Sequence, residues 1–425
     1  MNLSGMTELE RLRPTLRHLM LFASTIAGLL TAISWNSQPE QGSKPRSLSS
    51  EIYVWQRQRS EALDHSLRKL ADDPFAKTVH VLAAEAHWRD GRLRIQRFVQ
   101  PAIPANLHVG HVLRLGSSLA RCDWEDATVA DLSACVAELA ETSGVEVQID
   151  YDCPQSRLMD YADFLRKLRP HVKGKRLCIT ALPCWLNEPA FLHLASLADD
   201  YVLQVHSLHL PESADSLVTL IDPGEARTAA SQASALGLPF RLALPTYGCA
   251  VYFNKDDGVT DVISEDRSDT PINSRGQLGY SDPAVIAPLV AEWLESPPLH
   301  LKGLVWFRLP TTDDTRNWSL DTLARVARGM PVAERLRTEC IERAPGTFDV
   351  IITNKGNIDA HLPGTVRLDR SVAFADGTGG YVWQPDGVFT LTQHDWPWLR
   401  PQESTTIGWL RTVEAITEPP FASIK

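Results

Sequence analysis

The sequence predicts an α/β protein, a (β/α)₈ TIM barrel followed by a small C-terminal antiparallel β-sandwich. Over residues 51–331, short β-branched or aromatic runs alternate with helical apolar patterns, which is typical of parallel βα units. Over residues 340–425, short strands and turn residues follow one another without helical periodicity. No GxGxxG or GxxxxGK(S/T) motif follows the early strands, so a doubly wound nucleotide-binding sheet is the weaker alternative.

Eight barrel strands are expected, each a short run with apolar or β-branched residues. Their ranges are 52–56, 78–84, 109–115, 145–150, 176–182, 201–206, 240–245 and 303–309. Helices are expected over 129–142, 156–168, 188–197, 225–236, 283–294 and 319–329. A barrel of this kind carries its reactive side chains at the C-terminal ends of the strands, so these ends are where we look for a site.

The long segment 248–281 interrupts the rhythm before the last barrel strand. Loops of this length are commonly functional, and we interpret this one as a lid over the barrel mouth. Its many acidic residues argue against a polyanionic substrate. In the sandwich, Trp383, Trp396, Trp398 and Trp409 indicate either core packing, the simpler interpretation, or a platform that stacks on sugar rings.

The N-terminus predicts export across a membrane. Residues 19–39 carry no charge, and the strongly apolar stretch 19–35 follows a basic segment that contains Arg11, Arg13 and Arg17. We expect a signal peptide or membrane anchor over 1–35 and a linker over 36–50. The protein would then be periplasmic or secreted, with association to the inner membrane if the anchor is retained. A buried first helix is the alternative.

Composition excludes several classes of partner. The chain has 42 Lys and Arg against 52 Asp and Glu, a net charge of −10, so we expect no nucleic-acid partner. Seven cysteines lack CxxC spacing, and we expect neither a metal nor a cofactor. A metal-dependent hydrolase built on Asp150, Asp152, Glu85 and His206 is a third alternative, disfavoured because no HxH or HExxH spacing occurs.

The end of the fourth expected strand carries the strongest chemical signal. Alternation places Gln148, Asp150 and Asp152 on one face and leaves Ile149 and Tyr151 on the other. The apolar pair suits packing against helices, so the polar trio would point into the barrel mouth. Two neighbouring carboxylates repel, which raises one pKa and keeps an acid protonated near neutral pH. The alternative is that these aspartates cap a helix or bind a loop.

The other strand ends add residues that suit a carbohydrate, which needs aromatic faces for its C–H surfaces and polar groups for its hydroxyls. Each of them is weak evidence alone. The set is Trp55, Arg57, Glu85, Trp88, Gln204, His206, Tyr247, Trp306 and Arg308.

Three motifs carry a family resemblance. The run VEVQIDYDCP, the helix YADFLRKLR and the strand LCITALPCWL, with YVLQVHSL and GLVWFRLPTTDD later, resemble an uncharacterised bacterial barrel family, domain of unknown function 3142, over about 51–330. That family is similar to the chitinase-type, family-eighteen glycosidases. These enzymes carry DxDxE at the end of strand four and a tryptophan on strand eight. The resemblance implies that Asp152 takes the place of the general-acid Glu and Asp150 that of its supporting Asp, that Gln148 replaces an acid, and that Trp306 matches the tryptophan.

The resemblance implies a glycoside-hydrolase-like protein that acts on or binds an envelope or environmental polysaccharide. Asp152 would protonate the glycosidic oxygen, Asp150 would tune it, and Glu85 would be the second carboxylate if the substrate does not assist itself. Asp in place of Glu and the loss of an acid at Gln148 support the alternative, a catalytically inactive glycan-binding or envelope-assembly module.

Overall fold

The structure is a computed structural model, and it describes nine stretches of the chain. These are residues 47–122, 124–172, 174–206, 218–254, 258–263, 275–368, 372–392, 398–412 and 422–424. The expected export segment 1–35 and Trp396 lie outside them. Within these stretches no helix has the length and apolar character needed to cross a membrane. The chain divides into two units, Met1–Lys44 and Pro45–Lys425, and the second is described below.

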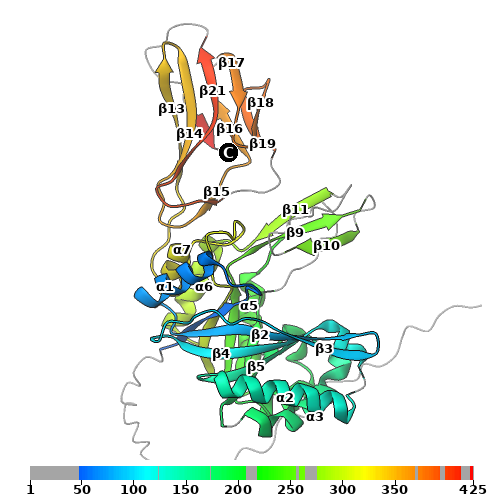
Figure 1. Cartoon of the computed structure of the whole chain (residues 1–425). Helices are drawn as coiled ribbons and strands as arrows, with labels where there is room; N and C mark the ends of the chain where they lie inside the picture. Colours follow the sequence, from blue (N-terminus) through cyan, green and yellow to red (C-terminus); the bar gives the residue numbers. More distant parts are fainter. Residues whose placement is uncertain are drawn as a thin grey trace, which may run out of the picture. The chain divides into compact units, whose positions relative to one another are not determined.

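Eight parallel strands close into a barrel, which confirms the predicted fold class (Figure 1). Around the barrel the order is β1-β2-β4-β5-β6-β7-β8-β12, and β12 pairs again with β1. Every strand overlaps an expected one. The bounds are β1 (Ser49–Val54), β2 (Thr78–Arg89), β4 (His108–Leu115), β5 (Glu146–Tyr151), β6 (Arg176–Ala181), β7 (Asp200–Gln204), β8 (Phe240–Pro245) and β12 (Leu301–Phe307).

Helices connect most of the strands and bury their apolar faces against the outside of the barrel. Several begin at a side-chain cap: the Ser60, Asp222, Asp282 and Ser319 side chains each accept a hydrogen bond from a backbone N–H of the first turn. The helices are α1 (Glu61–Asp72), which the sequence analysis did not name, α2 (Asp126–Thr142), α3 (Leu158–Leu168), α4 (Pro189–Ser196), α5 (Pro223–Ala235), α6 (Pro283–Glu295) and α7 (Leu320–Ala327).

A hairpin stands where the second βα unit would have its helix. β2 turns at Asp90 and Gly91, both at positive φ, into the antiparallel β3 (Arg92–Arg97). Two consecutive residues of positive φ, the second a glycine, are typical of a type I′ hairpin turn. Figure 1 shows this hairpin extending past the neighbouring strands.

Where the structure describes the segment 248–281, it is not one long loop, and its role as a lid over the barrel mouth stays a prediction. Its described part forms a three-stranded antiparallel sheet of β9 (Gly248–Phe253), β10 (Val259–Ile263) and β11 (Arg275–Tyr280). Alternate residues of β9, including Val251 and Phe253, are buried in a small apolar cluster with Val218 and Leu220. β9 is a short apolar run that is buried on both faces, which is the pattern of a fully covered strand, and stretches of turn residues and acids separate it from the next strands.

Antiparallel sheets follow the barrel, as predicted, and a second apolar core lies within them. Trp398 is buried and packs on His361, which fits core packing and excludes a sugar platform at this position. Trp383 packs on Phe389, and Trp409 is exposed. The strands are β13 (Leu336–Ala344), β14 (Thr347–Asn354), β15 (Ala360–His361), β16 (Thr365–Leu368), β17 (Val372–Gly377), β18 (Tyr381–Gln384), β19 (Val388–Leu391), β20 (Trp398–Leu399), β21 (Ser404–Thr412) and β22 (Ala422–Ile424).

Inward side chains stack in layers inside the barrel, and the lowest layer is ionic. Arg241 of β8, 1% exposed, donates hydrogen bonds to the carboxylates of Glu51, Glu146 and Asp200, from β1, β5 and β7. His80 of β2 lies 2.7 Å from Glu51. Burial raises the pKa of Glu51, but the Arg241 charge and the His80 hydrogen bond outweigh it and hold that pKa well below its usual value.

Replacing this guanidinium should destabilise the barrel strongly. Arg241→Met leaves three buried carboxylates without their central counter-charge, and we expect a loss of about 3–5 kcal/mol in the free energy of unfolding. Urea titration at neutral pH measures it. The matched control is Arg227→Met, which removes the exposed ion pair with Glu292 and should cost less than about 0.5 kcal/mol. Equal midpoints for both variants would show that the ionic layer does not hold the barrel together.

Candidate active site

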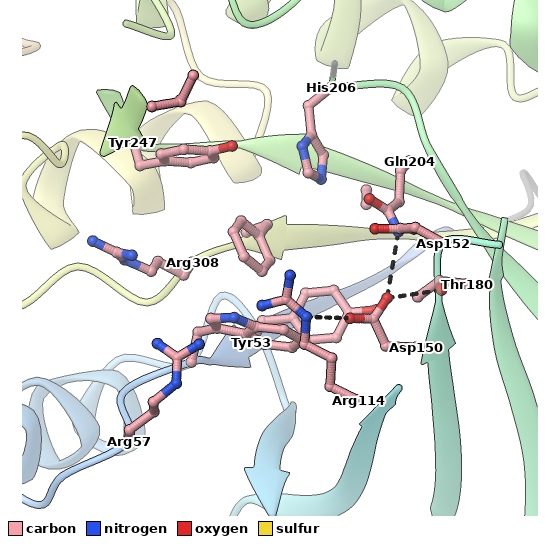
Figure 2. A pocket seen from close by; sticks show the side chains of 14 residues that line it. Tyr53, Arg57, Arg114, Asp150, Asp152, Thr180, Gln204, His206, Tyr247 and Arg308 are labelled. Carbon is pink, nitrogen blue, oxygen red and sulfur yellow. Dashed lines mark hydrogen bonds and ion pairs between the residues drawn. The ribbon is translucent and has the colours of Figure 1, made fainter. Parts of the chain in front are cut away.

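A cavity of about 510 Å³ opens at the C-terminal ends of the barrel strands (Figure 2). Its wall combines acids, arginines and aromatic rings from seven of the barrel strands and the residues that directly follow them, and β10 adds Val262. The lining residues are Tyr53, Trp55, Arg57, Arg114, Asp150, Asp152, Thr180, Gln204, His206, Ala243, Tyr247, Val262, Phe307 and Arg308.

Two carboxylates share one donor in this cavity. Asp150 is the last inward residue of β5 and is buried, whereas Asp152 follows the strand and is accessible to water. The side-chain amide of Gln204 lies 3.5 Å from Asp150 Oδ1 and 3.2 Å from Asp152 Oδ1 (Figure 2). The Thr180 hydroxyl donates a 2.8 Å hydrogen bond to Asp150. The pleat thus brings the two acids of the sequence motif to one point, as the alternation predicted.

Burial of Asp150 and the neighbouring charge of Asp152 raise the pKa of Asp150 to about 7, although Arg114 and the Thr180 hydrogen bond oppose the shift. The pKa of Asp152 is also raised, chiefly because the cavity walls remove part of the water around its still accessible carboxylate, against the Arg114 charge and the Gln204 hydrogen bond. The expected repulsion between neighbouring carboxylates is therefore present. Near neutral pH the pair holds a proton that it can deliver.

A chain of ion pairs leads from the acids to the rim. Arg114 Nε lies 3.7 Å from Asp150 Oδ2, and Arg114 Nη1 lies 3.8 Å from Glu85 Oε1. Arg57 donates a 2.7 Å hydrogen bond to the same Glu85 oxygen. Burial raises the pKa of Glu85, but the Arg57 hydrogen bond and the charges of Arg57 and Arg114 outweigh it and leave that pKa below its usual value. Glu85 is therefore an ionised anchor for two arginines.

Aromatic rings form the opposite wall. Phe307 lies at the centre, with Tyr53, Trp55, His206 and Tyr247 at ring-centroid distances between 5.0 and 5.7 Å. Burial lowers the pKa of His206 to about 4, so its imidazole is neutral near pH 7. Burial raises the pKa of Tyr247 to about 12, so its hydroxyl keeps its proton and can donate a hydrogen bond. Flat apolar faces beside neutral polar groups suit a sugar ring.

Most of the predicted site residues meet in this cavity: Asp150, Asp152, Trp55, Arg57, Gln204, His206, Tyr247 and Arg308. Arg308 is held by a buried ion pair of 2.6 Å with Asp314. Glu85 lies behind the wall, on Arg57. Gln148 lies one layer below Asp150, fully buried, with its amide 3.8 Å from Cys178 Sγ.

Two predicted residues point away from the cavity, which corrects the sequence analysis. Trp306 is fully buried on the helix side of β12, where its Nε1 donates to Ser50 Oγ, and Phe307 takes the inward place. Trp88 packs on the outer core. β12 is apolar on both faces, so hydrophobicity alone cannot say whether Trp306 or Phe307 faces inward. In β2, Trp88 has the opposite parity to Glu85 and His87, so the three could not all face the mouth.

Sequence reasoning missed Tyr53, Arg114, Thr180 and Phe307, all of which line the cavity. Arg114 had a usable signal, because it is a charged residue just before the end of an expected strand. Tyr53 had one as well, since it shares the parity of Trp55 and Arg57. Among the side chains that the structure describes, no group of three or more His, Cys, Asp or Glu is placed to hold a metal ion.

Comparison with known families confirms the resemblance proposed from the strand motifs. Residues 108–312 match the family described as domain of unknown function DUF3142, and residues 338–413 match that described as domain of unknown function DUF8456. No curated protein sequence matches this chain.

Several solved barrels share part of the architecture. The spore cortex-lytic enzyme SleL of Bacillus megaterium QM B1551 has 11% identity and a TM-score of 0.48, over 69% of this chain and 76% of that one. SleL of Bacillus cereus has 13% identity and a TM-score of 0.45, over 67% and 75%. Chitinase ChiA74 of Bacillus thuringiensis has 9% identity and a TM-score of 0.46, over 89% and 100%. The assignment of the fold rests instead on the closed strand order of this chain.

The buried acid should make the fold less stable as the pH rises. An unfolded Asp ionises near pH 4, whereas folded Asp150 holds its proton to about pH 7, so stability falls across that window and the full cost persists above it. Asp150→Asn is expected to be about 1–3 kcal/mol more stable than the wild type at pH 8 and to show no gain near pH 4. Urea unfolding at several pH values tests this. Asp163→Asn, on the exposed surface, should show no such trend.

Proposed function

We propose that this protein is a glycoside hydrolase whose barrel mouth cleaves an O-glycosidic bond of a polysaccharide. The observation that carries the proposal is the acid pair Asp150 and Asp152, bridged by Gln204 at the floor of an aromatic cavity. An acid with a pKa near the working pH is what protonation of a leaving group requires. Aromatic rings beside neutral donors suit the faces and the hydroxyls of a sugar.

In the proposed reaction the proton that the Asp150–Asp152 pair holds passes to Asp152, and Asp152 donates it to the glycosidic oxygen as the bond from that oxygen to the anomeric carbon breaks. Water then supplies a hydroxyl to the anomeric carbon, and its remaining proton returns to the carboxylate. Asp152 takes this role because it is accessible to water in the cavity, whereas Asp150 lies buried beneath it. Asp150 supplies the shared proton and helps to orient Asp152 through Gln204, whose amide lies within 3.5 Å of both carboxylates.

Glu85 is not placed to act as the second carboxylate. It does not line the cavity, and its Oε1 atom accepts a hydrogen bond from Arg57 and lies 3.8 Å from Arg114. A substrate that supplies its own nucleophile, such as a sugar with a 2-acetamido group, therefore fits better than a covalent glycosyl-enzyme formed on Glu85. The Tyr247 hydroxyl, which stays protonated, would donate to that group.

A catalytically inactive glycan-binding or envelope-assembly module is the second candidate. The specific observation in its favour is Gln148, an amide buried against Cys178 where the related motif carries an acid. Asp152 is also one methylene shorter than a glutamate and reaches less far. In this case the cavity and its aromatic wall would bind the same ligand without cleaving it.

The acid can be tested directly. Asp152→Asn should lower hydrolysis by roughly 10²- to 10⁴-fold, because the amide has no proton of suitable acidity to give. Release of reducing ends from a panel of bacterial and plant polysaccharides measures it, with product masses as confirmation. Asp160→Asn, outside the cavity on α3, is the control and should keep full activity. If Asp152→Asn keeps the wild-type turnover, the general acid is another residue. If the wild type binds glycan but never cleaves it, the result supports the inactive glycan-binding module.

We also propose that the protein is exported, to the periplasm or the exterior, on the strength of the uncharged stretch 19–39. A fusion of residues 1–50 to a reporter enzyme that is active only outside the cytoplasm should give signal. Replacing Leu29 and Leu30 by Arg interrupts the apolar run and should abolish that signal. A wild-type fusion that is silent, while a cytoplasmic reporter on the same segment works, would contradict export.

A further inference from the structure

The hairpin of β2 and β3 carries a dense row of arginines on one face. Arg89 and Arg92 lie directly opposite each other across the hairpin, and Arg94 lies opposite His87. Residues paired in this way point to the same side of the sheet. All three arginines are exposed. The other face is apolar, because Trp88, Leu93 and Ile95 pack on the outer core. We call Arg89, Arg92, Arg94 and His87 the hairpin strip.

The three arginines of the strip are not neutralised by the described protein, whereas His87 lies 3.6 Å from the Glu85 carboxylate. Arg89, Arg92 and Arg94 form no ion pair with any residue that the structure describes, whereas Arg97, on the opposite face of β3, pairs with Glu138 of α2. Like charges placed directly opposite each other destabilise a strand pair. The chain as a whole has a net charge of −10, so the positive charge of the strip is a local exception on an acidic protein. A cost of this kind indicates an external anion.

The strip leads into the cavity. A bulge in β2 between Leu82 and Ala84 shifts the register, so that Glu85 and His87 face the mouth. Glu85 holds Arg57 and approaches Arg114, which both line the cavity. β4 ends at Leu115, level with Ala86, so the strip lies beyond the edge of the barrel. The basic side chains therefore form a line that begins beside Asp150 and continues outward past the barrel edge, in the order Arg114, Arg57, His87, Arg94 and Arg89.

We propose that the hairpin strip binds a carboxylate-bearing polysaccharide chain and guides it into the cavity. This inference rests on the proposed function and names its substrate class: an acidic rather than a neutral glycan. Arginine fits a sugar carboxylate because its guanidinium donates two parallel hydrogen bonds to it. The earlier expectation against polyanions came from the acids of segment 248–281, which lie mostly outside the described residues.

A glycan explains the strip better than a nucleic acid does. The basic surface is a single narrow row. The rest of the protein carries an excess of negative charge, which would repel a long nucleic-acid duplex. The row also ends at a cavity whose aromatic rings suit the faces of a sugar. A nucleic acid is therefore an outcome that the test must be able to reveal.

The test is equilibrium binding of the full chain to polygalacturonate and to its fully methyl-esterified form, which has the same backbone without the charge. The wild type should bind the charged polymer at least tenfold more tightly, with an affinity that falls as salt rises. The triple variant Arg89→Gln, Arg92→Gln, Arg94→Gln should lose at least tenfold of that affinity. Its unfolding midpoint should not fall, because the substitutions remove like-charge neighbours.

The matched control is Arg68→Gln, Lys77→Gln, Lys302→Gln, which makes the same change in net charge at exposed positions. Lys77 precedes β2 at the end opposite to the strip, about 40 Å away along a twelve-residue strand. This control should stay within twofold of the wild-type affinity. Equal losses in both triples would show that net charge alone matters and would overturn the proposal.

Two further results would overturn it: equal wild-type affinity for the charged and esterified polymers, or tighter binding of a thirty-residue oligothymidylate than of polygalacturonate. The second would indicate a nucleic-acid surface. The affinity measurement needs no turnover, so it tests the strip even if the Asp150–Asp152 pair is catalytically inactive. If the strip has no affinity for the acidic polymer, the Asp152→Asn measurement still tests the proposed function.

Discussion

One buried guanidinium sets the register of the barrel. Arg241 bonds to acids from three other strands, β1, β5 and β7, and each of these acids is an inward residue near the start of its strand. A shift of one residue in any of these strands would turn its acid outward and remove one of the three carboxylates that bond to Arg241. Gly110 of β4 makes room for this layer, since a Cβ there would lie 2.7 Å from His80 Nδ1. The ionic layer therefore fixes which side chains of every strand face inward.

The chemistry at the other end of the barrel follows from that register. The inward residues of β5 are Glu146, Gln148 and Asp150, each two positions after the one before. One strand therefore carries an acid of the ionic layer, an uncharged amide and the buried acid of the cavity. The apolar middle layer, which includes Val112, Val202 and Val305, separates the two charged ends. This separation places the Arg241 charge beside Glu51, whose pKa it lowers, and away from Asp150, whose pKa is raised by burial and by Asp152.

The sequence allowed the barrel strands, the antiparallel sheets and the acid pair to be predicted, because alternation and βα rhythm are local patterns. It did not allow the face of Trp306 to be predicted, since β12 is apolar on both sides and a one-residue choice exchanges Trp306 for Phe307. The inward direction of Glu85 depends on a bulge in β2, and no local sequence pattern predicts this bulge. The sheet of β9 to β11 was hidden for a different reason: acids and turn residues between its strands look like one long loop.

The hairpin of β2 and β3 shows how the same fold gains a second surface. A helix after β2 would cover the outside of the barrel and leave the mouth unchanged. The hairpin covers the outer core with Trp88, Leu93 and Ile95 and continues the inward face of β2 beyond the edge of the barrel. The pleat then determines that every second residue, from Glu85 to Arg89, continues the line of the cavity wall. An extended ligand could therefore contact the strip and the acid pair at once, which a ligand confined to the cavity could not.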